Sequence, residues 1–418
     1  MRFTVIAAMS AAMLAGGCGA CNSTPKRSSL DAAARSYVRL VLALGERDSD
    51  SLDSYHGPPT WETEARHEHA TLGEIRAGAM TLADSLRADR AAAEGDEQRR
   101  GFLIRQLDAI ATRVDVLQGT RPAFDDEARR LFAVDWPDQT RSDDERVRAE
   151  LDRLLPGRGD LAERYAAFDR QFLIPSDRLA AVLSRAIEGC RAATRQHVAL
   201  PTQERVRVDY VRDSSWSAFT RYEGRFVSRI LVNAALPVTV DRALDLACHE
   251  AYPGHHTISV LLDARFGERR PELLVQPLFS PQSSLHEAAA SLAPALAFSE
   301  AARIAFERDE LFPLAGLDAA DAARHATVGR LVDRLHPVVA DVARQYLDGV
   351  LDFPRAAAAL QRDALMPNAD ATLKFVNQFR SYAATYTVGR DRLSRVVAGN
   401  WASYLRAVTD PAQTLPRP

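Results

Sequence analysis

The spacing of apolar residues is the feature of this chain that most constrains its fold. Apolar residues recur every three or four positions over residues 30–47, 72–93 and 99–117, and again over 161–196. Because residues three and four apart share one face of an α-helix, each segment predicts an amphipathic helix with one buried side. The abundance of Ala, Leu and Arg agrees with this prediction. We therefore expect a mainly α fold.

Two stretches interrupt the helical pattern. Residues 48–71 contain a Gly-Pro-Pro sequence and are predicted as a loop. Residues 206–211, 217–222 and 226–232 are rich in β-branched and aromatic residues and are separated by turn-like breaks. These three segments predict a small β-sheet, so the expected fold class is mainly α with a small sheet (α+β).

Helical spacing returns after the predicted sheet. Residues 240–251 repeat apolar side chains at helical positions, and from residue 284 to the C-terminus the pattern is again helical. Proline removes a backbone donor and clashes with the preceding turn, so it tends to end helices. We expect breaks in the C-terminal helices at four prolines: Pro294, Pro313, Pro354 and Pro367.

The charges of the chain are nearly balanced. It has 53 basic and 56 acidic residues among 418, for a formal net charge of −3. A protein that holds nucleic acid or an anionic membrane through a basic surface usually has a basic excess. We therefore expect no nucleic-acid partner.

The N-terminus has the pattern of an export signal. A basic start is followed by a short apolar run over residues 3–14 and by small residues up to Cys18. This predicts a signal peptide over 1–17, a lipidated Cys18 and a tether over 18–29. The run is too short to span a bilayer, so we expect membrane attachment through the N-terminal lipid only. Cys21 is a second candidate, and secretion to the periplasm without a lipid is the alternative.

Two cysteines, Cys190 and Cys248, remain in the body of the chain. Two cysteines do not make a disulfide framework, although a single bridge between them can form in an oxidising compartment. The sequence leaves this pairing open.

The densest group of metal-ligand residue types is His-Glu-Ala-Tyr-Pro-Gly-His-His at residues 249–256. In many zinc hydrolases two histidines four apart on a helix bind the ion, and a glutamate beside the first acts on water. Here Pro253 and Gly254 insert two residues into that order. Because proline cannot continue the helix, we expect a bulge that returns His255 to the position of the second ligand. His256, which lies nearly in line with His249 on an ideal helix, is the alternative.

A catalytic zinc site commonly has three protein ligands, so a third ligand is expected from another segment. Glu287, in Ser-Leu-His-Glu at residues 284–287, is our candidate. A competing explanation is a capping box, in which Ser284 and Glu287 close the first turn of a helix. His286 is an adjacent alternative ligand. Spacing alone does not separate these readings.

The residues at 249–256 resemble the His-Glu-x-x-Pro-Gly-His-His signature of a bacterial family called domain of unknown function 885, which is grouped with the gluzincin metallopeptidases. Two further stretches are similar to that family: the helix that begins at residue 161 and the Arg-Ser-Tyr…Tyr…Gly segment at 380–389. The resemblance spans residues 154–400. It implies a zincin-like helical fold with a central cleft, and it maps the family's third-ligand glutamate onto Glu287.

The chain also departs from the family pattern. Ala288 and Ala289 stand where the family has Gly-Trp, and Pro294 falls where it often has a second acidic residue. Thr257 and Ile258 replace Leu-Gln after the histidine pair. These departures bear on substrate preference more than on the metal. With the resemblance included, we expect a helical N-terminal region over 30–199 and a catalytic region over 200–410.

The function expected from these residues is zinc-dependent hydrolysis, most simply of peptides. Zinc held by His249, His255 and Glu287 would activate a water, and Glu250 would take its proton. Two tyrosines of the C-terminal segment, Tyr382 and Tyr386, can donate to the oxyanion, and Arg380 can pair with a substrate carboxylate. The alternatives are a hydrolase of other amides or esters and an envelope lipoprotein that binds or scaffolds without catalysis.

Overall fold

The computed structural model describes residues 29–89, 94–136, 143–410 and 415. The predicted signal peptide, Cys18, Cys21 and almost all of the predicted tether lie outside the described residues. Among the residues that are described, none of the helices combines the length and the apolar character needed to cross a bilayer.

Helices make up most of the fold, as the apolar spacing predicts. In the first half they are Ser29–Gly45 (α1), Pro59–Glu68 (α2), Leu72–Ala88 (α3), Glu94–Leu117 (α4), Phe124–Phe132 (α5), Asp144–Leu154 (α6), Leu161–Asp169 (α7) and Leu179–Arg195 (α8). In the second half they are Val240–Glu250 (α9), His255–Phe266 (α10), Pro281–Ala297 (α11), Glu300–Phe306 (α12), Phe312–Ala315 (α13), Ala322–Asp333 (α14), Val338–Leu347 (α15), Phe353–Asp363 (α16), Ala369–Phe379 (α17), Arg390–Val397 (α18) and Trp401–Thr409 (α19).

Two small sheets accompany the helices. Strands Arg205–Val211 (β2), Ala218–Gly224 (β3) and Val227–Asn233 (β4) form a three-stranded sheet in the order β2-β4-β3. The pair β2 and β4 is parallel, and the pair β3 and β4 is antiparallel. The predicted small sheet is therefore confirmed to within two residues at each strand end. The mainly α fold class with a small β component is confirmed as well.

The second sheet is absent from the sequence-based prediction. Leu52–Tyr55 (β1) pairs antiparallel with Val275–Pro277 (β5), and the segment predicted as a loop over 48–71 also contains α2. The loop prediction is therefore wrong for most of its length. A four-residue strand that pairs with a partner 220 residues away has no local signal. The proline pair that indicated a turn instead begins α2, where Pro59 is the first helical residue.

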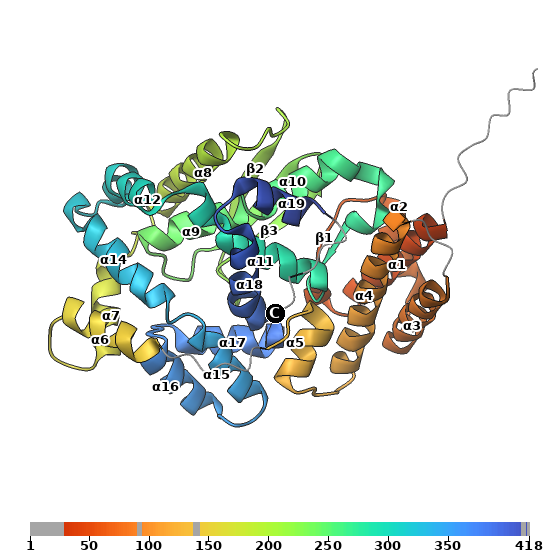
Figure 1. Ribbon diagram of the computed structural model, residues 1–418, viewed down its shortest axis with the longest axis horizontal. Helices are drawn as coiled ribbons and strands as arrows, with labels where there is room; N and C mark the ends of the chain where they lie inside the picture. Colours follow the sequence, from red (N-terminus) through yellow and green to blue (C-terminus); the bar gives the residue numbers. More distant parts are fainter. Residues whose placement is uncertain (1–28, 90–93, 137–142, 411–414, 416–418) are drawn as a thin grey trace, which may run out of the picture.

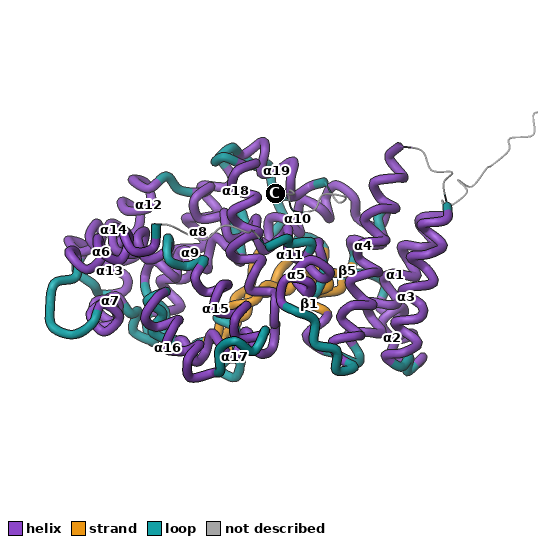
Figure 2. The backbone as a smooth tube through the Cα atoms, turned by 60° about the horizontal axis from the view of Figure 1, so that its bottom comes forward, coloured by secondary structure: helices purple, strands orange, loops and turns teal. Residues whose placement is uncertain are grey.

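The helices are arranged around a central pair, α9 and α11 (Figure 1). At one end of the elongated molecule α1, α3 and α4 pack together, and at the opposite end lie α6, α7 and α14 (Figure 1). The strands run through the middle of the molecule, enclosed by helices (Figure 2). Separate apolar clusters fill these parts, with Tyr37 and Leu103 buried among the N-terminal helices and Leu244 and Phe312 buried around α9. The middle of the molecule, where α9, α11 and both sheets meet, is where the polar side chains described below converge.

The C-terminal half follows the predicted helical pattern with one exception. Pro313 and Pro354 stand in the first turns of α13 and α16, and Pro367 lies between α16 and α17. Pro294, however, lies inside α11, which continues to Ala297. The predicted break there is wrong. The proline stands in the last turn, where only three further residues follow, so the lost backbone bond ends the helix soon after rather than at the proline.

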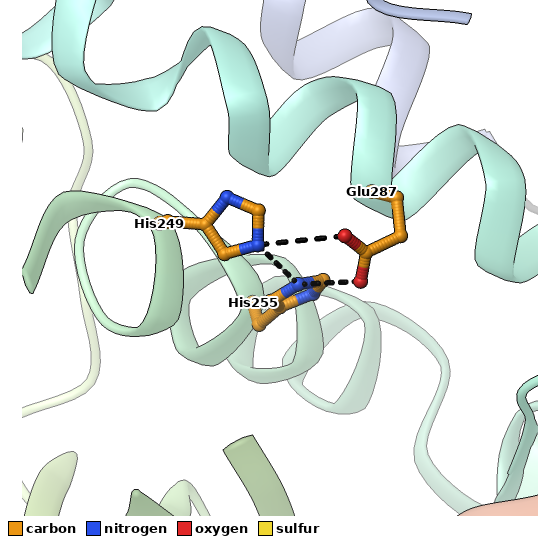
Figure 3. A group of neighbouring side chains, drawn as sticks. All are labelled: His249, His255 and Glu287. Carbon is orange, nitrogen blue, oxygen red and sulfur yellow. Dashed lines mark hydrogen bonds and ion pairs between the residues drawn. The ribbon is translucent and has the colours of Figure 1, made fainter. Parts of the chain in front are cut away.

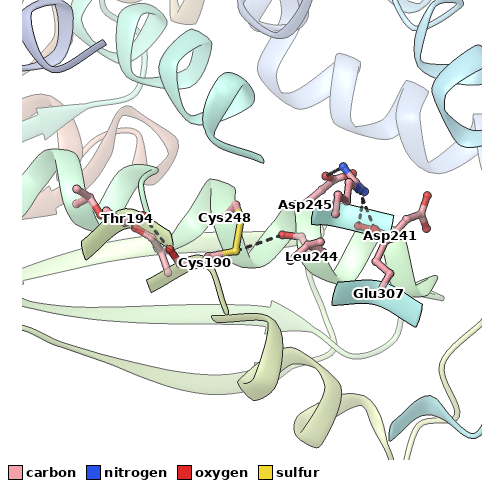
Figure 4. The surroundings of a disulfide bond; sticks show 10 residues. Cys190, Thr194, Asp241, Leu244, Asp245, Cys248 and Glu307 are labelled. Carbon is pink, nitrogen blue, oxygen red and sulfur yellow. Dashed lines mark hydrogen bonds and ion pairs between the residues drawn. A yellow bond between two sulfur atoms is a disulfide. The ribbon is translucent and has the colours of Figure 1, made fainter. Parts of the chain in front are cut away.

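A disulfide between Cys190 and Cys248 joins α8 to α9 (Figure 4). Both cysteines are fully buried. The pairing that the sequence left open is therefore formed, and it ties down the end of α9 that carries His249.

Candidate metal centre

Helix α9 and its interruption place the first two histidines. The apolar stripe of α9, which includes Val240, Leu244 and Ala247, is buried, and this fixes the outward direction of His249. The helix ends at Glu250 and α10 begins at His255, so four residues separate them. The predicted bulge within one helix is therefore replaced by a break between two helices. Pro253 accounts for it, since it cannot supply the backbone donor that a continuous helix requires.

The four-residue connection is held by specific bonds. The Gly254 amide donates to the Cys248 carbonyl at 3.0 Å, and the Tyr404 hydroxyl donates to the Pro253 carbonyl at 3.0 Å. A Cβ atom on residue 254 would overlap the His249 carbonyl oxygen, so only glycine fits there. This close approach folds the chain back and brings His255 beside His249.

Three side chains from three helices converge on one point (Figure 3). The Nε2 atoms of His249 and His255 lie 3.2 Å apart. Glu287 Oε1 lies 3.0 Å from His255 Nε2, and Glu287 Oε2 lies 3.5 Å from His249 Nε2. Among the described residues, these are the ones whose donor atoms group closely enough to hold a metal ion, all within 4.8 Å of one another.

Glu287 is not a capping residue. Helix α11 begins at Pro281, and its N-cap is Ser280, whose hydroxyl accepts from the Ser283 amide at 3.0 Å. Ser284 therefore lies inside the helix, and the capping-box explanation for Glu287 is wrong. The carboxylate points instead toward the two histidines (Figure 3), with one oxygen near each ring.

The pKa values of His255 and Glu287 depend on each other. Burial lowers the pKa of His255, but the adjacent Glu287 carboxylate outweighs burial and raises this pKa to about 9. Burial acts to raise the pKa of Glu287, and the two histidines reverse this and hold it well below its ordinary value. Without a metal, the cluster is thus stabilised by a proton on the histidine side. A dication can take the place of that proton.

The two alternative histidines lie elsewhere. His256 is fully buried, its Nδ1 lies 2.8 Å from Ser228 Oγ, and its Nε2 lies 3.1 Å from Glu204 Oε2. His286 lines the same cavity as the cluster, but its donor atoms do not join the group. Burial, together with the nearby His255, lowers the pKa of His286 to about 3, so this ring is neutral.

Glu204 is a buried residue that no sequence pattern singles out. Its carboxylate accepts from the Tyr252 hydroxyl, from His256 Nε2 and from Arg191. Burial alone would raise the pKa of Glu204, but these donors lower it to about 2. Tyr252 lies within the break between α9 and α10 and His256 directly follows its end, so this network fixes the connection that places His249 and His255.

The cluster lies in a cavity of about 240 Å³. Glu250 lines it beside His249, and its Oε2 accepts from the Thr220 hydroxyl at 2.7 Å. The same hydroxyl lies 3.0 Å from the Glu250 carbonyl, so Thr220 holds both ends of this residue. Glu250 Oε1 has no hydrogen bond to any described residue and is free to act in the cavity.

Both predicted tyrosines line this cavity. Tyr386 lies in a π-helical turn, Thr385–Gly389, and its ring centre is 6.3 Å from that of His249. Burial, and then the nearby Glu287, raise the pKa of Tyr386 well above its ordinary value, so the phenol keeps its proton. The Tyr382 hydroxyl lies 3.2 Å from Ser283 Oγ. The Tyr386 hydroxyl is hydrogen-bonded to the Glu287 side chain instead, which places it at the metal cluster, where it can donate to a bound group.

Arg380 is placed differently from the prediction. Its Nε donates to Glu127 Oε2 at 2.7 Å, and Arg380 does not line the cavity. Glu127 is fully buried and also accepts from Ser381. The Arg380 guanidinium is therefore engaged in joining α5 to the C-terminal segment rather than presented to a substrate.

Asp53, on β1, is a cavity residue that the sequence analysis missed. Burial, followed by the neighbouring Glu287 carboxylate, raises the pKa of Asp53 to about 8. The residue lies about 200 positions before the histidine motif, in a segment predicted as a loop, so no sequence pattern joins the two. The cavity consequently combines residues from the regions 30–199 and 200–410.

Comparisons with known proteins give little beyond this geometry. No protein-family model matches the sequence, and no curated protein is significantly similar to it. A solved structure of a candidate lipoprotein from Colwellia psychrerythraea is similar, with 14% identity, a TM-score of 0.49, and coverage of 82% of this chain and 68% of the other. This similarity is too low to carry information on function.

Proposed function

We propose that this protein is a zinc-dependent hydrolase, and that its substrates are peptides or small amides or esters. The observation that carries the proposal is the convergence of His249 Nε2, His255 Nε2 and the Glu287 carboxylate at 3.0–3.5 Å from one another. Two imidazoles and one carboxylate are a ligand set of catalytic zinc, which leaves a fourth position for water.

The distances fit such an ion. Ligand atoms about 2.0–2.1 Å from zinc at the corners of a tetrahedron lie roughly 3.3 Å from one another. The two imidazole nitrogens lie 3.2 Å apart, and each lies 3.0 or 3.5 Å from a different oxygen of the Glu287 carboxylate, which is close to the size of such a site. The side chains are 10–20% exposed, so an ion can enter from the cavity.

The residues around the cluster suit hydrolysis. When bound, zinc supplies a Lewis acid that lowers the pKa of water and polarises a carbonyl. Glu250, held by Thr220, takes a proton from the water as its oxygen bonds to the carbonyl carbon. Tyr386 donates to the carbonyl oxygen as negative charge develops there. Glu250 then passes the proton to the leaving nitrogen as the carbon–nitrogen bond breaks.

Two further observations support an exported hydrolase. The motif at 249–256 resembles that of the domain of unknown function 885 family, whose third-ligand position corresponds to Glu287. The disulfide between Cys190 and Cys248 is typical of oxidising compartments. We infer a location in the bacterial cell envelope, with Cys18 as the lipid-bearing residue or, alternatively, with secretion to the periplasm.

The test is metal analysis of the purified protein together with a peptide-library assay of the wild type and of Glu250→Gln. The proposal predicts about one zinc per chain, and cleavage that Glu250→Gln lowers by about 10²- to 10⁴-fold without loss of zinc. Protein that binds no zinc and cleaves nothing would contradict the proposal. It would favour the alternative, an envelope lipoprotein that binds or scaffolds without catalysis.

A further inference from the structure

Asp53 enters the cavity because of an irregularity in the small sheet. Leu52 pairs with Pro277, and Ser54 pairs with Gln276, so the register shifts at the residue between them. Asp53 is therefore the extra residue of a β-bulge. A bulge redirects the side chain of the extra residue, and bulges are common next to functional sites.

The neighbours of Asp53 are bonded, whereas its own carboxylate is not. Ser54 Oγ donates to Gln276 Oε1 at 2.9 Å, and Gln276 Nε2 donates to Ser259 Oγ at 3.0 Å. These bonds fix the strand on both sides. No described residue gives the Asp53 carboxylate a hydrogen bond or an ion pair, although it lines the cavity beside His255 and Glu287. A carboxylate held in place without a donor is prepared to receive a cationic group from outside the chain.

The charges of the cavity favour a cationic group. Among the described residues that line it, the acidic ones are Asp50, Asp53, Glu250 and Glu287, and the basic one is Arg221. With all four carboxyl groups ionised, a bound dication would still leave the lining with an excess negative charge. Asp50 differs from Asp53 because both of its oxygens accept from Gln378 Nε2 at 3.0 Å. Asp53 therefore has no partner among the described residues, and with a pKa of about 8 it keeps its proton near neutral pH until a cationic group pairs with it and favours its ionised form.

We propose that Asp53 binds the free α-ammonium group of a peptide substrate, which would make the protein an aminopeptidase. This inference rests on the proposed hydrolase function and names its substrate class. An amino-terminal residue places its ammonium group two bonds from the scissile carbonyl carbon. A carboxylate near the metal cluster, but outside it, is in the right region to receive that group while the carbonyl lies at the cluster.

The aromatic residues that line the cavity indicate what kind of side chain the first residue of the substrate has. Trp216 and Phe219 on one side have ring centres 5.8 Å apart, and Phe375 and Phe379 on another have ring centres 4.6 Å apart. Aromatic walls of this kind bind apolar side chains. The expected substrate is a short peptide with a free amino terminus and an apolar first residue.

Ligand binding tests the proposal without relying on catalysis. Phenylalaninamide and N-acetylphenylalaninamide differ in the charge of one nitrogen, and calorimetry on the full mature protein, with and without added zinc, compares them. We expect phenylalaninamide to bind about 10- to 100-fold more tightly, because a hydrogen-bonded charge pair is worth that much. Equal affinities, or no measurable binding of either ligand in both metal states, would overturn the proposal.

Two variants test whether the preference for the free amine depends on Asp53. Asp53→Asn keeps the shape of the side chain and removes its charge, and it is expected to reduce the preference for the free amine by about tenfold or more. Asp50→Asn removes a charge from the same cavity and is expected to keep the preference, because Asp50 is bound by Gln378. If both variants reduce the preference equally, the effect is one of total charge, and the assignment to Asp53 is wrong.

Cleavage assays distinguish the aminopeptidase proposal from the more general hydrolase proposal. Active enzyme should cleave peptides with a free amino terminus about 100-fold faster than their N-acetylated forms, and C-terminal amidation should have little effect. Equal cleavage of free and acetylated peptides would refute the aminopeptidase and leave the hydrolase standing. A preference for free carboxyl ends would assign recognition to Arg221 instead. An inactive, zinc-free protein would refute the hydrolase, and the calorimetric comparison would still decide the role of Asp53.

Discussion

The two ends of helix α9 both carry ionisable side chains, but they differ in what those side chains contact. Toward the first end, Arg303 donates to the Asp241 carbonyl, to Glu307 and, with Nη1 at 2.7 Å, to Asp245 in the middle of the helix. At the last end, His249 and Glu250 face a cavity in which no Lys or Arg of the described residues pairs with the carboxylates. Figure 4 shows Asp241, Asp245 and Glu307 together with the disulfide, whose Cys248 lies next to His249 at the other end.

The difference is the source of the positive charge. At the Arg303 end the chain supplies its own cation, which donates to Asp245 and Glu307. At the His249 end two imidazoles and a carboxylate converge without a described Lys or Arg, so the positive charge is either a proton on the histidines or a cation from the cavity. A polar cluster thus indicates a ligand site when its donor atoms converge without an internal partner, rather than because it is rich in charge.

The largest expected effect is a difference in zinc affinity between a variant in the His249 cluster and a variant in the Arg303 cluster. Glu287→Gln removes one of the three proposed ligands and is expected to weaken zinc binding by more than about 100-fold, since even changes behind the ligands cost about 10- to 100-fold. Glu307→Gln removes an acid from the other cluster and should leave the affinity unchanged. Competition with a chelating dye measures both. Equal zinc affinities in the two variants would remove the distinction between the clusters.

A substitution in the Arg303 cluster is expected to affect the stability of the fold rather than zinc affinity. Arg303→Met leaves the acids of its cluster without their cation and is expected to lower the free energy of unfolding by about 3–4 kcal/mol, the lower part of the range for partly buried pairs. Arg308→Met is the matched control, because Arg308 pairs with Asp309 on the surface and should change stability by less than about 0.5 kcal/mol. Urea denaturation compares them. Similar stability losses in the two variants would show that burial of the Arg303 cluster is not what matters.

The disulfide should affect the stability of the whole chain more than the affinity for metal. Its cysteines are separated by 58 positions, and replacing both with alanine is expected to lower the free energy of unfolding by about 3 kcal/mol through greater freedom of the unfolded chain. Zinc affinity should fall by less than about tenfold, because the break after Glu250 is held by other bonds. Thermal melts and the dye assay test the pair. A variant of normal stability that no longer binds zinc would reverse this assignment.

The smallest expected effect is a dependence of stability on pH at the Arg303 end. Burial raises the pKa of Glu307 from its ordinary 4.5 to about 7, so the folded chain keeps a proton that the unfolded chain has lost. The resulting stability is fully present below about pH 4.5 and is lost as pH rises through about 7. Between about pH 5 and 8 the wild type should lose about 2–3 kcal/mol more than Glu307→Gln. Parallel curves would mean that Glu307 is ionised throughout. Asp309→Asn, at an exposed acid, is the control.

Much of the fold was predictable because its signals are local. The helices follow from apolar spacing within each segment, and the strands of the three-stranded sheet follow from short runs of β-branched residues. The candidate ligands were named for the same reason, since two of them lie within one short motif and Glu287 lies about thirty positions on. What these predictions share is that each depends on neighbouring residues.

The features that were missed depend on distant contacts. The bulge at Asp53 exists only because β1 pairs with β5, and the network around Glu204 exists only once α8 and the sheet meet the break after α9. Arg380 was assigned to a substrate because nothing in the sequence shows that Glu127, 253 positions earlier, accepts its Nε. The π-helical turn that places Tyr386 likewise depends on the packing of α11 against the C-terminal segment.

The most direct test of the central claim is X-ray absorption spectroscopy at the zinc edge on protein loaded with one equivalent of zinc. Binding by His249, His255 and Glu287 predicts a first shell of two imidazole nitrogens and one or two oxygens at about 2.0–2.1 Å, and loss of one imidazole contribution in His255→Ala. A shell of water oxygens alone, or a spectrum that His255→Ala leaves unchanged, would contradict the claim.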